Sequence, residues 1–168
     1  MDSTQTLAAQ ELALLIDFNG PRSDERVFQR VLANALGQVP GFAAAVGLPP
    51  GAYSLDPRQD YPAITLEDQD GYRAGVQVKL HSNVYYSRHF TQMRLDVYAE
   101  KALPMTLLLL VVADDHLAKL QLMIASEGVK HIDRWEVCLT SQLRWALPPV
   151  PPLEPEVTAL LLQLARVS

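Results

Sequence analysis

The chain has 168 residues, 49% of them apolar, which is enough to build one globular domain with its own hydrophobic core over residues 1–168. Fourteen basic and nineteen acidic side chains give a formal net charge of -5, which argues against a protein that coats nucleic acid by overall charge alone. The single cysteine, Cys138, excludes an internal disulfide and a multi-cysteine zinc site, and we interpret it as a core residue of a cytoplasmic protein.

The N-terminal part of the chain predicts two helices. The first is capped by Ser3 or Thr4 and runs to about Leu15, with leucines as its apolar positions. The second is capped by Ser23 and stopped by Gly37, with apolar residues at helical spacing between them. Residues 40–62, rich in glycine and proline, indicate an ordered irregular crossing.

A β-hairpin is the next predicted element. Residues 63–67 and 72–81 have the composition of two strands, and Asp70-Gly71 supplies residue types that tolerate a tight turn. The apolar run at 103–113 is far shorter than the ~20 residues of a membrane span, and its residues 105–112 indicate a buried strand. The other expected elements are a helix at 90–101, strands at 120–125 and 134–140, a stiff proline-rich segment at 147–155 and a C-terminal helix at 156–167.

The segment from Gly75 to Leu80 carries the clearest functional pattern. Alternate side chains of a strand share a face, so Gln77 and Lys79 are expected on one face, with Val76, Val78 and Leu80 facing the core. Any amphipathic strand that is half buried has the same pattern. The pattern alone therefore does not distinguish an active-site strand from an ordinary one.

The order of these elements resembles that of the P-D…(D/E)-x-K nuclease superfamily. The resemblance rests on Asp60-Tyr61, Gly71, the stretch from Gly75 to Lys79, and the apolar strand that follows Leu103-Pro104. The resemblance covers about the middle third of the chain. This segment is similar to an uncharacterised bacterial branch of the superfamily with the pattern D…Q-x-K. It implies an α/β fold of restriction-endonuclease type, with a mixed central β-sheet flanked by helices.

The resemblance also implies a chemistry and a set of site residues. Metal-assisted phosphodiester hydrolysis needs oxygen ligands for Mg²⁺ and a cation that positions water and offsets phosphate charge. By position, Asp60 would be the metal carboxylate, Gln77 a second ligand, Lys79 the catalytic lysine and Glu25 a further acid from the second helix. The second aspartate that the branch carries after the Asp-Tyr pair is missing at 62–65.

A polar stretch directly after Lys79 is a candidate nucleic-acid contact. His81, Tyr85, Arg88 and His89 combine cationic groups with rings that could stack on bases, although a polar loop would have the same composition. We therefore expect a Mg²⁺-dependent nuclease or a nuclease-derived, DNA-binding protein that processes nucleic acid, with the choice between DNA and RNA as substrate left open by the sequence. The alternatives are a non-enzymatic interaction module on the same fold, with a protein partner or a second copy of the chain, and an unrelated α/β binding protein.

Two histidines and two tryptophans complete the candidates for chemistry. His116 follows two aspartates in a turn, and His131 lies near Asp133, but neither group has the partners of a metal site or a catalytic triad. We interpret Trp135 and Trp145, ten residues apart, as residues of the core and its rim rather than as a pair of rings that binds a ligand. The sequence assigns none of these four a catalytic role.

Overall fold

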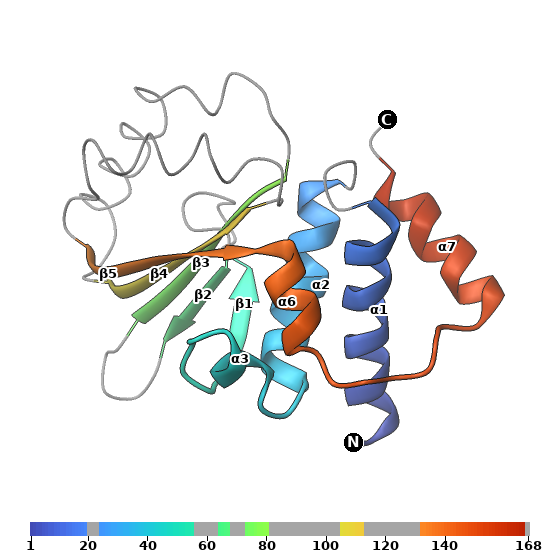
Figure 1. Ribbon diagram of the computed structural model, residues 1–168, viewed down its shortest axis with the longest axis horizontal. Coiled ribbons are helices and arrows are strands. Elements are labelled where there is room, and N and C mark those ends of the chain that lie inside the picture. The colour runs from blue at the N-terminus through green and yellow to red at the C-terminus, as the bar shows by residue number, and fades with distance from the viewer. Residues whose placement is uncertain (20–23, 56–63, 68–72, 81–104, 113–131, 167–168) are drawn as a thin grey trace.

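The computed structural model describes residues 1–19, 24–55, 64–67, 73–80, 105–112 and 132–166. Within these ranges, helices pack against one face of a mixed five-stranded sheet (Figure 1). The predicted α/β class with a mixed central sheet is therefore correct for the described part of the chain. The predicted helix at 90–101 and strand at 120–125 lie outside the described residues.

Helix α1 (Ser3–Asn19) extends one turn beyond its predicted end at Leu15. Of its predicted apolar positions, Leu12 and Leu15 are buried, whereas Leu7 is 41% exposed. The helices that contact α1 are α2 (Glu25–Gln38), α6 (Thr140–Ala146) and α7 (Pro155–Ala165) (Figure 1).

Helix α2 (Glu25–Gln38) is capped by Asp24 and not by the predicted Ser23. The Asp24 carboxylate accepts hydrogen bonds from the backbone N–H groups of Arg26 and Val27, which would otherwise lack partners in the first turn. Gly37 lies in the last turn and does not terminate the helix, because the Val39 N–H closes that turn on the Ala35 carbonyl. The predicted apolar face is buried, namely Phe28, Val31, Leu32, Ala35 and Leu36.

The glycine-rich crossing contains two short elements that its composition did not predict, helix α3 (Phe42–Ala45) and strand β1 (Tyr53–Leu55). Gly41 enters α3 with φ 76°, a left-handed conformation that glycine adopts without a Cβ clash. Gly51 allows β1 to approach the sheet, because a Cβ there would lie 2.5 Å from Leu66 Cδ1. The prediction of an irregular crossing is therefore wrong for α3 and β1, and tertiary packing accounts for the order of this segment.

The sheet has the strand order β1-β2-β3-β4-β5. β2 (Ile64–Glu67) and β3 (Arg73–Lys79) pair antiparallel as the predicted hairpin, and β1 pairs antiparallel with β2. β4 (Met105–Val112), within its predicted bounds, and β5 (Ile132–Leu139) extend the sheet in parallel to β3. β3, β4 and β5 therefore end at the same edge of the sheet.

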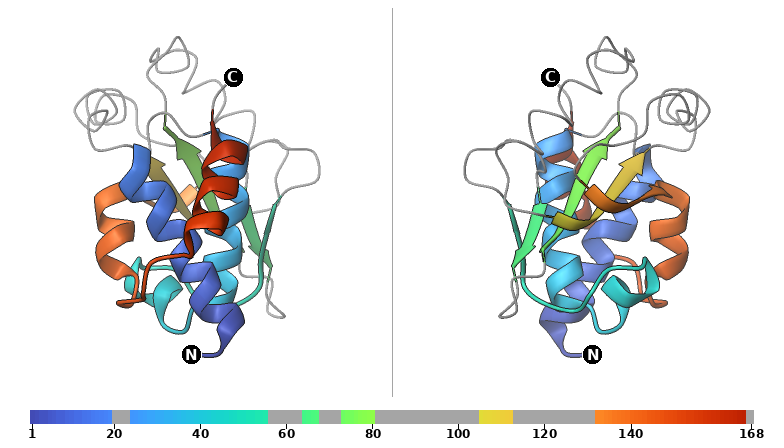
Figure 2. Two further views of the ribbon diagram at one scale, coloured as in Figure 1. Left: turned by 90° about the vertical axis from the view of Figure 1, so that its right-hand side faces the viewer. Right: turned by 90° about the vertical axis from the view of Figure 1, so that its left-hand side faces the viewer.

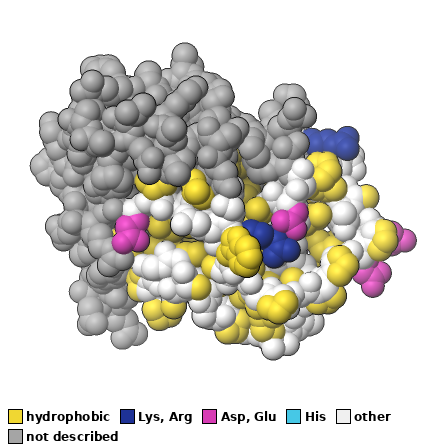
Figure 3. All heavy atoms as spheres, viewed as in Figure 1, with side chains coloured by type: hydrophobic (Ala, Val, Ile, Leu, Met, Phe, Trp, Pro, Cys, Tyr) yellow, Lys and Arg dark blue, Asp and Glu magenta, His cyan; other side chains and the backbone are white. Residues whose placement is uncertain are grey.

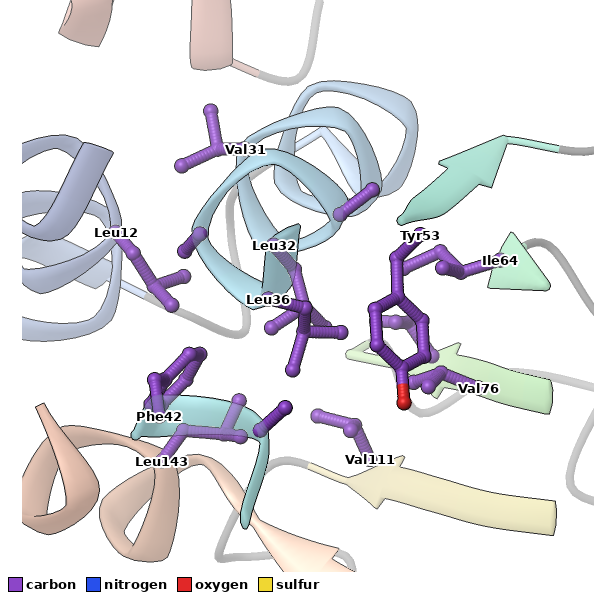
Figure 4. Close-up of a cluster of buried hydrophobic side chains, with 14 of the residues drawn as sticks. Leu12, Val31, Leu32, Leu36, Phe42, Tyr53, Ile64, Val76, Val111 and Leu143 are labelled. Atoms are coloured by element: carbon purple, nitrogen blue, oxygen red, sulfur yellow. The ribbon is translucent and has the colours of Figure 1, made fainter. Parts of the chain in front are cut away.

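The core lies between the sheet and helices α1, α2, α3 and α6 (Figure 4). The register places Val78, Val111 and Cys138 side by side on three neighbouring strands, and all three are buried. Cys138 is thus a core residue, as predicted. The largest side chains of the cluster that Figure 4 labels come from every layer, among them Leu12, Leu32, Leu36, Phe42, Tyr53, Ile64, Val76, Val111 and Leu143.

The C-terminal part of the chain returns across the helices. β5 ends at Leu139, so the predicted strand at 134–140 is displaced, and a helix that was not predicted, α6 (Thr140–Ala146), begins at Thr140. Extended chain follows at 147–154, and the predicted last helix is α7 (Pro155–Ala165). Of the helices in the described ranges, none has both the length and the apolar character needed to cross a membrane.

Candidate functional site at the carboxyl end of strand β3

Strand β3 occupies the middle of the sheet, hydrogen-bonded to β2 on one side and to β4 on the other. Gln77 pairs with Leu110 and Lys79 with Val112, so both lie in the half of β3 that runs towards the shared carboxyl edge. Ligands of open α/β sheets bind outside the carboxyl ends of the strands, which makes this edge the natural place for a site.

Gln77 is more deeply buried than its pattern predicts. Its exposure is 5%, while Val76 and Val78 on the helix-facing side are 0% exposed. The prediction of a half-buried strand is therefore wrong for residues 74–78, which are buried on both faces. The prediction that Val76, Val78 and Leu80 face the core is confirmed. The side chain of Lys79 lies outside the described part of the structure.

Glu25 reaches the end of β3 from the first turn of α2. Its Oε1 accepts a hydrogen bond from the backbone N–H of Leu80 at 2.9 Å, in a partly buried setting. Leu80 directly follows Lys79 and is itself fully buried, so its N–H has little access to water. A carboxylate acceptor satisfies this N–H with a charge-assisted bond, the stronger kind of hydrogen bond.

Of the predicted site residues, the structure describes the side chains of Glu25 and Gln77 and the backbone of Lys79. Glu25 lies at the end of β3, on the backbone N–H of Leu80, whereas Gln77 lies on the face of β3 opposite Val76 and Val78. Asp60, the predicted metal carboxylate, lies outside the described residues, as do the predicted nucleic-acid contacts His81, Tyr85, Arg88 and His89. Their placement in the site remains a prediction from the sequence.

The donors available for a cation are a carboxylate and an amide. Oxygen ligands of this kind suit Mg²⁺, which prefers hard donors and retains several waters. Within the described ranges, however, no group of three or more His, Cys, Asp or Glu side chains is placed to hold a metal ion. Glu25 and Gln77 thus have the donor chemistry of magnesium ligands, and the described residues form no metal shell.

The link between Glu25 and Leu80 was not predicted from the sequence, although Glu25 itself was a candidate. The available signal was an acidic residue next to the cap of a well-defined helix, where a carboxylate is favourable in any helix. No pattern in the sequence connects that position to a backbone N–H 55 positions later. The contact depends on how α2 packs across the sheet.

Comparisons with protein-family models, with curated proteins and with solved structures found no match for this chain.

Proposed function

We propose that the chain is a Mg²⁺-dependent nuclease, or a nuclease-derived protein that processes nucleic acid, with its site at the carboxyl end of β3. The fold type proposed with it is the restriction-endonuclease-like one. The mixed sheet supports that proposal, since a hairpin is followed by a very apolar strand that pairs in parallel with the second hairpin strand.

The observation that carries the proposal is the bond from the Leu80 N–H to Glu25 Oε1 at 2.9 Å. It brings an acidic side chain from a distant helix to the strand end that already holds Gln77 and Lys79. An acid, an amide and a lysine near one strand end are residue types that metal-assisted phosphodiester hydrolysis uses, and this supports the proposal.

The roles proposed for the side chains follow from their chemistry. Asp60 and Gln77 would hold the cation with Glu25 as a further acid, and Lys79 would orient water and offset charge on the phosphate. Mg²⁺, when bound there, would supply Lewis-acid polarisation of a phosphodiester oxygen. His81, Tyr85, Arg88 and His89 are the proposed contacts to the nucleic acid.

The test is a cleavage assay on plasmid, linear and single-stranded DNA and on RNA, with Mg²⁺ or Mn²⁺ and with chelator. We expect metal-dependent cleavage that Lys79→Ala lowers by about 10²-fold or more, the usual scale for losing one catalytic or charge-stabilising group. Arg30→Ala, which removes an exposed cation from α2, serves as the matched control and should keep full activity. Equal cleavage by wild type and Lys79→Ala would identify a contaminant and refute the nuclease.

A second candidate function is a non-enzymatic interaction module on the same fold. The observation that favours it is the exposed apolar surface of α7, where Val157, Leu160 and Leu164 are 43%, 64% and 65% exposed. A chain that binds nucleic acid without cleaving it, or that binds neither nucleic acid nor metal in the assay above, would favour this alternative.

A further inference from the structure

Helix α7 lies on the outside of α1 and α2, at the end of the molecule remote from the sheet (Figures 1 and 2). Both ends of the segment are attached to the body. Gln10 Nε2 donates to the Pro151 carbonyl at 2.7 Å, and the Asp24 N–H donates to the Ala165 carbonyl at 2.7 Å. Leu161 and Ala165 pack against the core. The helix is therefore presented in a fixed orientation.

The outer side of this helix carries an apolar stripe formed by Val157, Leu160 and Leu164. These residues are spaced three and four positions apart, so they lie on one side of the helix, next to the partly buried Leu161. Hydrophobic side chains are also visible over the helical half of the molecule, with few charges among them (Figure 3). Leaving such leucines in water forgoes the free energy that burial would provide.

We propose that this stripe is the interface of a homodimer in which α7 packs antiparallel on α7 of a second copy. A second copy is favoured because the charges along α7 are self-complementary. Glu154 and Glu156 lie at its N-terminal end and Arg166 follows its C-terminal end, and all three are exposed. In an antiparallel pair, related by a two-fold axis perpendicular to the helices, opposite charges meet at both ends. In a parallel pair, like charges would meet.

The spacing of the stripe agrees with the same axis. Val157 lies three and Leu164 four positions from Leu160, the central residue of α7, so a two-fold axis close to Leu160 places Val157 of one copy opposite Leu164 of the other. It also brings Arg166 of the second copy to the level of Glu154 and Glu156. The antiparallel arrangement opposes the two helix dipoles, which is the favourable orientation.

The expected dimer is weak. α7 has 11 residues and is therefore about 16 Å long, too short to reach the roughly 800 Å² per partner of a standard stable interface by itself. We expect a reversible monomer–dimer equilibrium in the micromolar range or above. The proposal does not depend on nuclease activity, since α7 is remote from β3.

Sedimentation equilibrium of the full chain from about 1 µM to about 1 mM tests the proposal. The mass should rise with concentration from the monomer value of 18.6 kDa towards that of a dimer. Leu160→Glu should raise the dissociation constant at least about tenfold without lowering the melting temperature, because the side chain is exposed. The matched control is Trp145→Ser, which removes an 89% exposed apolar side chain from α6 and should leave the equilibrium unchanged.

Charge reversal tests the orientation. Arg166→Glu should weaken the dimer several-fold, and combining it with Glu154→Arg and Glu156→Arg should restore the wild-type constant to within about threefold. A monomer at every concentration would overturn the proposal and leave the stripe to a different macromolecule. A dimer unaffected by Leu160→Glu would place the interface elsewhere and overturn it too. A dimer lost with Leu160→Glu but unaffected by Arg166→Glu would overturn the antiparallel arrangement.

Discussion

Glu25 connects helix α2 to the end of strand β3 across 55 positions of sequence. The Leu80 N–H directly follows Lys79, the last β3 residue in register with β4. The Glu25 carboxylate supplies the acceptor. The bond fixes the peptide group between Lys79 and Leu80, and so the backbone on which the proposed catalytic lysine is mounted.

Removing this acceptor should destabilise the protein. We expect Glu25→Ala to lower the free energy of unfolding by about 1–3 kcal/mol, because it leaves a buried N–H without a partner, and Glu25→Gln to cost less because its amide oxygen still accepts. Chemical denaturation measures the loss, and hydrogen exchange of the Leu80 amide localises it.

Arg26→Ala is the matched control, since Arg26 is the exposed neighbour on the same helix turn. Exchange at Leu80 that is equally slow in wild type and Glu25→Ala would contradict the role given to the bond. Weakened Mn²⁺ binding by Glu25→Gln, with Leu80 exchange unchanged, would mark Glu25 as a metal ligand as well.

Glu11 is a charged residue that the fold holds at a cost. Burial in α1 raises the pKa of its carboxyl above the ordinary value of 4.5. A carboxyl with a raised pKa in the folded state favours folding when protonated, and that contribution is lost as the pH rises through the folded pKa. The cost of burial thus falls on the ionised form of Glu11.

Glu11→Gln should consequently raise the melting temperature more at high pH than at low pH, because only the ionised wild-type carboxylate carries the cost of burial. Thermal unfolding of both proteins at high and at low pH measures the difference. Glu136→Gln removes an exposed carboxylate from β5, outside the proposed dimer interface, and serves as the control. A Glu11→Gln effect that is the same at both pH values would refute the assignment to charge burial.

At the scale of elements, the proline-rich segment is attached to the helical body of the protein. Val150 packs against the core, and Gln10 donates to the Pro151 carbonyl. The composition of residues 147–155 predicts the extended backbone, because proline excludes helix and removes N–H donors. The composition does not predict the contact with α1, because that contact depends on where β5 and α6 end in the folded protein.

Deleting residues 148–168 should therefore destabilise the whole protein. The deletion removes Val150, Leu161 and Ala165 from the core and leaves the Asp24 N–H without its acceptor, a loss on the order of 3 kcal/mol. Differential scanning calorimetry checks this, with Leu160→Glu as the variant that alters α7 without touching the core. A deletion variant as stable as the full chain would contradict the stabilising role assigned to these contacts.

The elements that the sequence predicted well are those with a local cause. The buried face of α2 follows from apolar residues at helical spacing, and β4 from an uninterrupted apolar run. β1 and α6 were missed because their states have no comparable local signal. β1 has three residues, too few to show a period, and is a strand because β2 pairs with it and Gly51 admits Leu66.

For the molecule as a whole, the sequence by itself determined the α/β class, the hairpin, the apolar central strand and a set of candidate site residues, because periodicity, turn residues and residue chemistry are local properties. Only the tertiary structure decided that Gln77 is buried, that Glu25 binds the Leu80 N–H and that α7 exposes its leucines. Each of these depends on which surfaces meet when helices and strands distant in sequence pack together, and spacing along one segment does not encode that packing.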